Sequence, residues 1–179
     1  MLYQGPASMF SAVLDLPRRT RAAMAFAAAL LLPTGGSAVA ASPAPPPPAG
    51  CTGPVSSTWV KVVVEGVHDN SGQIAITLYA DDSSRFLIRH GSLYIGRTPA
   101  VAGTTTSCIF VPHPGVYALA VYHDANGNGN FDRNSLGLPA EAYGFSNNPP
   151  TLLGLPAFRS VRIEVQRSGM ATHIQLKYP

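Results

Sequence analysis

The sequence predicts an all-β fold: a single antiparallel β-sandwich of about seven strands with an immunoglobulin-like or transthyretin-like arrangement. Two observations predict it. Beyond residue 58 apolar residues recur at every second position, which is the period of a strand and not of a helix. Turn residues such as Asn-Ser-Gly and Pro-Gly separate these short runs. Runs with one polar face bury only the other face, as the strands of a sandwich do.

The first two runs predict a β-hairpin. Apolar and other residues alternate over 60–65 and again over 74–79, and Asn70-Ser71-Gly72 between them supplies turn chemistry. A short helix capped by Asp or Ser is predicted over 82–90. Further strands are predicted over residues 93–100, 105–111, 116–123, 161–166 and 174–178, with Gly169 in the turn between the last two.

The chain begins with the features of a secretory signal peptide. Arg18, Arg19 and Arg21 precede an apolar run over 22–33, and Ala38-Val39-Ala40 follows it. An uncleaved anchor is the alternative, although the run is shorter than the roughly 20 residues that a membrane span needs. We expect a signal peptide over 1–40, cleavage near Ala40, a periplasmic or secreted protein, and no stable membrane span after cleavage.

Residues 41–50 predict a Pro-rich linker, because "SPAPPPPAG" is typical of an extended spacer. Residues 51–179 then form one β-sandwich domain of ordinary size. Three of the 12 Lys/Arg and one of the 9 Asp/Glu lie in the leader. The rest of the chain then has nine basic and eight acidic residues, a net charge of +1. This balance provides no basic patch and argues against a nucleic-acid partner.

The two cysteines, Cys51 and Cys108, predict a disulfide, because an exported chain with two cysteines usually pairs them. The alternative is a lipid on Cys51, since Ala49-Gly50-Cys51 resembles the end of a lipobox. Zinc is disfavoured because no second Cys or His lies at close spacing.

Residues 122–148, "YHDANGNGNFDRNSLGLPAEAYGFSNN", contain a candidate metal loop. Acidic and amide side chains at alternate positions of a tight turn can direct oxygen atoms toward one cation, and calcium prefers such ligands. Gly129 takes the sixth position, where a calcium loop turns sharply, but Ser135 replaces the Glu expected at the twelfth. The predicted ligands are Asp124, Asn126, Asn128, Asn130 through its carbonyl, Asp132 and Glu141.

Only Asp124 and Asp132 carry charge within residues 124–132, so a calcium site here is expected to be weak, with a Kd of order ~10⁻⁴–10⁻³ M. The alternative is a purely structural connection, because two Asn-Gly pairs also suit turns. A catalytic interpretation has less support: Gly144-Phe145-Ser146-Asn147-Asn148 lacks the last glycine of a nucleophile elbow. His123, at the end of a strand, is expected to be a hydrogen-bonded structural residue.

The same block resembles a bacterial family of exported domains, domain of unknown function 2141. The resemblance is specific because it spans a long motif, and it extends over about residues 60–179, including the ending "IQLKYP". One position departs from the family pattern: this chain has Ala142 after Glu141, where the family often has a Gly or a bulkier residue. The residues that match the family motif are His123, Asp124, Asn126, Asn128, Gly129, Asp132, Gly137, Pro139, Glu141, Gly144, Phe145, Ser146 and Asn147. The resemblance implies an exported β-rich domain and brings no established activity.

Two classes of function follow. The first is a non-enzymatic periplasmic or surface module whose loop binds calcium and which recognises an envelope or extracellular ligand. The second is a hydrolase of envelope or extracellular polymers that uses Asp124, Asp132 or Glu141.

Overall fold

Eight strands form two sheets whose apolar faces meet in one core. The computed structural model describes residues 45–152 and 155–179, all of them in the unit that spans Ala41–Pro179; the predicted signal peptide over 1–40 lies outside the described residues. The elements are β1 Thr58–Val67, β2 Gln73–Ala80, β3 Tyr94–Pro99, β4 Gly103–Val111, β5 Gly115–Asp124, β6 Tyr143–Phe145, α1 Phe158–Val161, β7 Arg162–Val165 and β8 Met170–Gln175.

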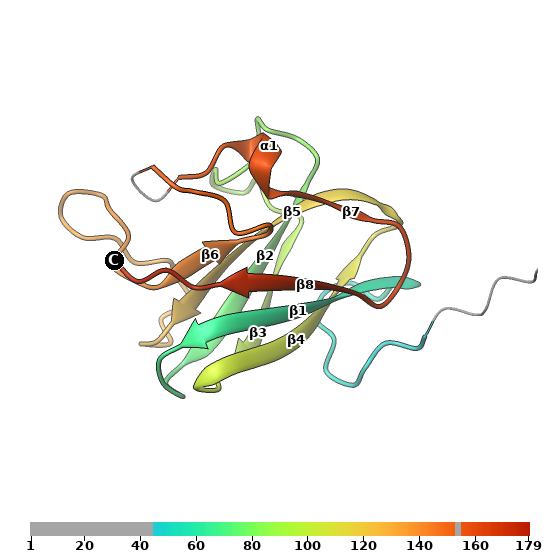
Figure 1. The fold of residues 1–179 in the computed structure, drawn as a ribbon, viewed down its shortest axis with the longest axis horizontal. Helices are drawn as coiled ribbons and strands as arrows, with labels where there is room; N and C mark the ends of the chain where they lie inside the picture. Colours follow the sequence, from blue (N-terminus) through green and yellow to red (C-terminus); the bar gives the residue numbers. More distant parts are fainter. Residues whose placement is uncertain (1–44, 153–154) are drawn as a thin grey trace, which may run out of the picture. The chain divides into compact units, whose positions relative to one another are not determined.

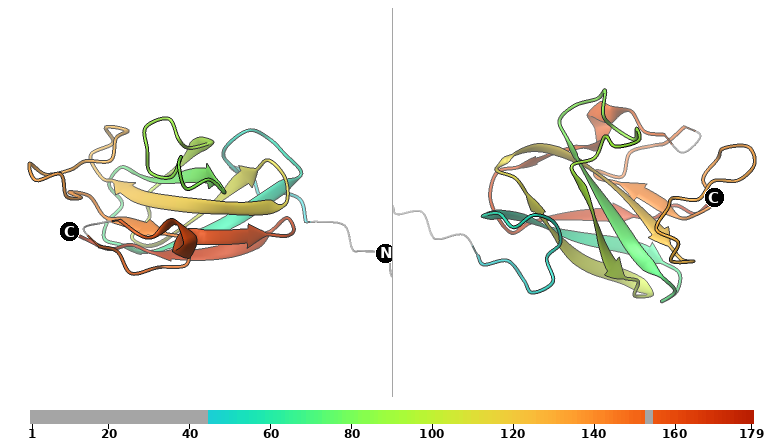
Figure 2. Two further views of the ribbon diagram at one scale, coloured as in Figure 1. Left: turned by 90° about the horizontal axis from the view of Figure 1, so that it is seen from above. Right: turned by 180° about the vertical axis from the view of Figure 1, so that it is seen from behind.

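The smaller sheet has the order β4-β1-β8, and the larger has the order β3-β2-β5-β6 with β7 also paired to β5. Figure 1 shows β1, β4 and β8 on one side and β2 and β6 behind them, and the left view of Figure 2 shows the layers from above. The predicted all-β sandwich is confirmed. Among the named strands one pair departs from antiparallel pairing, because β8 runs parallel to β1, with Val62 opposite Thr172.

The predicted hairpin between the first two runs is wrong. β1 pairs with β4 and β8, whereas β2 pairs with β3 and β5, so the chain crosses from one sheet to the other after Val67. The turn at Gly72 has a φ of +61° and packs on the end of β5, where an added Cβ would lie 1.9 Å from the carbonyl oxygen of Asp124. Alternation had indicated which face of each strand is buried, but not which strand is its partner.

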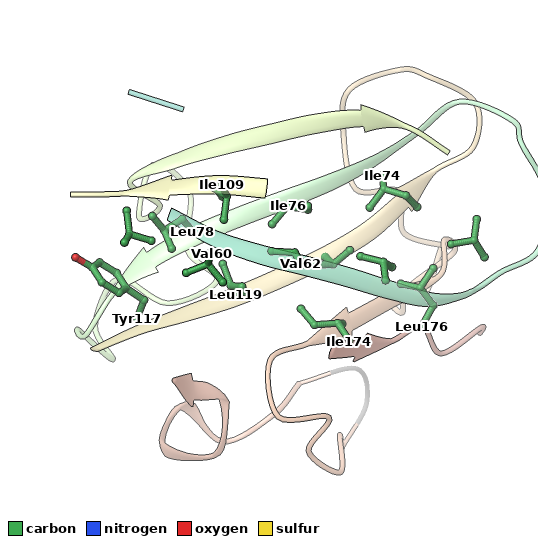
Figure 3. Packing of buried hydrophobic residues seen from close by; sticks show 14 of the residues in the cluster. Val60, Val62, Ile74, Ile76, Leu78, Ile109, Tyr117, Leu119, Ile174 and Leu176 are labelled. Atoms are coloured by element: carbon green, nitrogen blue, oxygen red, sulfur yellow. The ribbon is translucent and has the colours of Figure 1, made fainter. Parts of the chain in front are cut away.

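The core lies between the sheets. Val60, Val62 and Val64 from β1 face Ile74, Ile76 and Leu78 from β2, and all are at most 2% exposed (Figure 3). On β5, Tyr117, Leu119 and Val121 complete the layer and are buried together with His123, as their shared face predicts. Each fully buried aliphatic side chain of this kind contributes about 1.5–3 kcal/mol to folding.

The larger sheet is also covered on its outer face, contrary to the expectation that each strand buries one face. A second apolar cluster there contains Tyr79, Phe86, Ala118, Phe145 and Val161. The predicted helix over 82–90 is wrong and is replaced by turns that carry Phe86 onto this face. Leu87 and His90 have φ values of +57° and +58°, which a right-handed helix does not accommodate.

The disulfide between Cys51 and Cys108 is present, with a Cα–Cα distance of 4.6 Å. It fastens the segment before β1 to the outer face of the smaller sheet, where Cys108 packs with Trp59 and Phe110. Thr52 exchanges backbone hydrogen bonds with β4, to the Cys108 oxygen and from the Phe110 nitrogen, both at 3.0 Å. Within the described residues no helix has the length and apolarity to cross a membrane.

Candidate functional site

All six predicted metal ligands lie between the last residue of β5 and the start of β6, in a segment that projects from the end of the sandwich (Figure 1). The antiparallel pairing of β5 with β6 places Tyr122 opposite Tyr143, and the His123 amide donates to the Ala142 oxygen at 2.9 Å. Asp124 and Glu141 therefore lie next to this paired stretch, one on each side of the loop.

Asp124 lies at the base of the loop and is completely buried. Its Oδ2 accepts a hydrogen bond from the Gly129 amide at 2.9 Å, which closes a ring from the first to the sixth position of the motif. The turn that this requires is made possible by Gly127 and Gly129, with φ values of +69° and +80°. Oδ1 of Asp124 is buried and has no hydrogen-bond partner among the described residues.

Glu141 approaches the loop from the other side. Its Oε2 accepts a hydrogen bond from the Asp132 amide at 3.0 Å, and its Oε1 is buried without a partner in the part of the chain described. Burial raises the pKa of the Glu141 carboxyl, and the nearby charges of Asp132 and Asp124 act in the same direction, whereas the backbone amides of Asp132 and Ala125 lower it. The carboxylates of Asp124 and Asp132 thus repel the carboxylate of Glu141, which is partly shielded from water.

The asparagines form a network that ends on Asp132. The Nδ2 groups of Asn126 and Asn128 donate to Asp132 Oδ2 at 2.8 and 2.9 Å. The Oδ1 of Asn126 accepts from the Asn128 amide, and that of Asn128 accepts from the Asn130 amide, at 3.0 and 2.7 Å. These side chains are exposed, and each also serves a local turn, as asparagine commonly does.

Two buried carboxylate oxygens of this segment, Asp124 Oδ1 and Glu141 Oε1, have no hydrogen-bond partner among the described residues. Burying such an oxygen without a partner is costly, and a bound ion removes the cost. Across residues 45–152 and 155–179, no three His, Cys, Asp or Glu side chains form a group that could hold a metal. The predicted ligands Asp124, Asp132 and Glu141 are thus not gathered into such a group, and an ion here would also need amide and backbone oxygens, which calcium accepts.

The second half of the block has structural contacts. Ser146 is completely buried; its hydroxyl accepts from the Leu119 amide at 3.0 Å and donates to the Val161 oxygen. Asn147 donates from Nδ2 to the Arg162 oxygen at 2.7 Å. Asn148 bonds β8 twice, from Nδ2 to the His173 oxygen at 3.1 Å and from the Gln175 amide to Oδ1 at 2.8 Å. These residues attach β6 to the C-terminal strands.

His123 is bound in place as expected, with Nε2 2.8 Å from the Ser71 oxygen, and it lies 4.0 Å from Asp69. A Ser-His-Asp arrangement of Ser146, His123 and Asp124 is not formed, because the serine hydroxyl is engaged by backbone groups and the histidine faces the β1–β2 turn.

Sequence reasoning missed the aromatic residues beside the loop. Arg97 Nη2 donates to the Gly129 oxygen at 2.7 Å, and the Tyr122 hydroxyl donates to the same oxygen at 3.3 Å. Phe131, within the loop, packs against Tyr122 with ring centroids 5.4 Å apart. The available signal was that alternate positions over 75–79 of β2 and 118–122 of β5 carry Ala, Thr and Tyr, without charge, on the side taken to be polar.

Comparison with known proteins identifies a family. Residues 62–173 match the family model described as "Uncharacterized protein conserved in bacteria (DUF2141)". No curated protein and no solved structure matches the chain.

Proposed function

The chain belongs to the bacterial family DUF2141, and from that premise we propose that it is an exported, non-enzymatic β-sandwich module. In this proposal the loop over residues 124–141 binds calcium weakly, and the ordered module recognises an envelope or extracellular ligand. The family description assigns no activity, so the proposal depends on the chemistry of the site.

The observation that carries the calcium proposal is the pair of buried, unpartnered oxygens, Asp124 Oδ1 and Glu141 Oε1. They belong to the two residues that flank the loop, and Asp124 is 0% exposed. The raised pKa of Glu141 has the same origin, because burial and the neighbouring carboxylates both disfavour its charge. A divalent cation would offset both effects.

Binding would require the loop to rearrange. The amide groups of Asn126 and Asn128 now direct nitrogen toward Asp132, so they would have to turn their oxygens toward an ion, and their hydrogen bonds to the Asp132 carboxylate would break. This reorganisation opposes binding and supports the expectation of a Kd of order ~10⁻⁴–10⁻³ M, the range of extracellular calcium modules.

Export is supported by the disulfide and by the leader. A bond between Cys51 and Cys108 persists in an oxidising compartment and is rare in the cytosol of mesophiles. The basic cluster and apolar run of residues 18–33 match the signal-peptide pattern.

A hydrolase is the second candidate, and the raised pKa of Glu141 is the observation that favours it, since a carboxyl with a raised pKa is suited to act as a general acid. Burial weighs against it. Asp124 is completely buried, and a polymer cannot reach its oxygens without displacing the loop.

Thermal unfolding tests the calcium proposal. At about 10 mM calcium, the free energy of unfolding should rise by roughly 1.4–2.7 kcal/mol for the Kd range above. Magnesium should have a smaller effect because it demands a tighter octahedral shell. Asp124→Asn should remove the calcium effect, whereas Glu164→Gln, which removes an exposed carboxylate on β7, should retain it.

Calcium-independent melting of the wild-type protein would refute the calcium site. Turnover of an envelope or extracellular polymer that is lost in Glu141→Gln would favour the hydrolase instead.

A further inference from the structure

The outer face of the larger sheet contains a groove of about 530 Å³. Its floor is formed by side chains that point away from the core, among them Thr77 and Tyr79 of β2, Ala120 and Tyr122 of β5, and Tyr143 of β6. The turns that follow β2 form one wall, and residues 129–131 and 133 of the β5–β6 loop form another. A groove of this volume lies within the roughly 300–1,000 Å³ range of small-molecule sites.

A series of aromatic rings lines the groove, and Phe86, which is not itself part of the lining, extends this series. Phe131 packs edge-on against Tyr122 and Tyr143, with centroid distances of 5.4 and 6.2 Å. Tyr143 contacts Phe145 at 5.9 Å, and Phe145 contacts Phe86 at 6.2 Å. These rings pack on one another, so their arrangement does not depend on an occupant. Ring edges and faces in such a series provide large contact areas for an apolar ligand.

The rim adds exposed aliphatic side chains. Ile88 and Ile95 are 54% and 42% exposed, and Leu87 is 36% exposed. All three line the groove. Exposed apolar side chains gathered around one concavity are typical of a binding surface, whereas single ones are common anywhere on a protein.

The charged side chains that line the groove are positive. Arg89 and Arg133 line it, and no Asp or Glu does so in the described part of the chain. The guanidinium of Arg133 lies 5.2 Å from the centre of the Phe131 ring. Within the described residues its hydrogen bond is from Nη1 to the Gly137 oxygen at 2.8 Å, so most of its five N–H donors face no protein acceptor.

From this combination we propose that the groove binds a single-chain anionic amphiphile, a fatty carboxylate. The acyl chain would lie on the aromatic floor between the aliphatic rim residues. The carboxylate would meet the guanidinium of Arg133, with Arg89 adding positive potential. A cationic amphiphile of the same chain length would be repelled, and a neutral one would leave the guanidinium groups unmatched.

This inference does not require the calcium site, because the floor and the arginines are in place without an ion. The two sites nevertheless share a wall at Gly129. Its amide donates to Asp124, and its carbonyl oxygen accepts a hydrogen bond from Arg97 beside the groove.

Isothermal titration calorimetry with the full mature protein tests the proposal, using decanoate below its micelle concentration. Decanoate should bind with one-to-one stoichiometry, and decyltrimethylammonium should bind at least about tenfold more weakly. Arg133→Met should weaken decanoate binding by about tenfold or more, because a hydrogen bond to a charged group is lost. Arg167→Met, which removes an exposed arginine outside the groove, should leave it unchanged.

Ala120→Phe supplies a second variant, which fills the floor from a half-buried position on β5 and should abolish binding. If that variant does not fold, the Arg133→Met comparison still decides the result. Absence of decanoate binding, equal affinity for both detergents, or full binding to Arg133→Met would overturn the proposal. Calcium binding that persists with no decanoate binding would reject this inference and leave the proposed function intact.

Discussion

The backbone amide of Asp132 donates a hydrogen bond of 3.0 Å to Oε2 of Glu141. This bond joins the end of the Asn-rich loop to the residue that lies two before β6. It leaves the other carboxylate oxygen of Glu141 buried and unpartnered, like one oxygen of Asp124. The loop thus stores an electrostatic penalty that a cation or a proton can relieve.

Glu141→Gln should therefore stabilise the protein at pH 7 in the presence of a chelator. Burial and the nearby carboxylates raise the pKa of Glu141 above its reference value of 4.5. An acid whose pKa is higher in the folded than in the unfolded protein stabilises the fold below its unfolded pKa. This stabilisation is lost as the pH rises through its folded pKa. The melting difference between variant and wild type should consequently be largest at pH 7 and vanish near pH 4.

Calcium should reverse the sign of that difference, because the variant loses a ligand. Glu164→Gln is the control and should show no such reversal. A variant that is less stable than wild type at pH 7 in chelator would show that the Glu141 charge is already compensated.

Removing the disulfide should cost about 4 kcal/mol of stability. The closed loop spans 57 residues, and the chain-entropy treatment gives roughly this value. Cys51→Ser with Cys108→Ser should lower the midpoint of denaturant unfolding, followed through emission of Trp59, which packs beside Cys108. An unchanged midpoint would mean that the covalent link adds nothing to the other contacts of this segment.

Asn148→Ala should cost about 1–3 kcal/mol, since the side chain makes two hydrogen bonds to β8 and the backbone has a φ of +48°. Asn148→Gly tolerates the backbone conformation and should isolate the hydrogen-bond contribution. Thermal melting of both variants provides the comparison. Equal stability of Asn148→Ala and wild type would contradict the structural role of this residue.

The mature protein should begin near Ala41 in periplasmic or secreted material. N-terminal sequencing of protein from that fraction measures this directly. A full-length cytoplasmic protein that retains Met1 would contradict the prediction.

Much of the fold follows from local patterns. Alternation located β1, β2, β4 and β5 closely, because a half-buried strand requires a period of two. The pairing of the strands could not be predicted from alternation, because the Asn-Ser-Gly turn joins strands of different sheets and does not form a hairpin. β6, three residues long, was missed because so short a strand carries no period and depends on its pairing with β5.

At the site, spacing predicted a sharp turn at Gly129, and its φ of +80° agrees. It assigned no structural role to Asn147 and Asn148, which hold the last strands. That role depends on residues distant in sequence, such as Gln175, and no local pattern contains it. The groove was missed for the same reason, because its rings come from separate elements and meet only in the folded chain.

The most direct test of the calcium site is a titration of the ¹⁵N-labelled mature protein with calcium, followed through its backbone amide resonances. The amides of Gly129 and Asp132 bind the carboxylates of Asp124 and Glu141, so they report on any ion that those groups accept. We predict saturable shifts concentrated in residues 124–132 and around 141, with a Kd of order ~10⁻⁴–10⁻³ M, and their loss in Asp124→Asn. Unmoved resonances for Gly129 and Asp132 up to about 10 mM calcium, or shifts only near exposed carboxylates such as Glu164, would contradict the account.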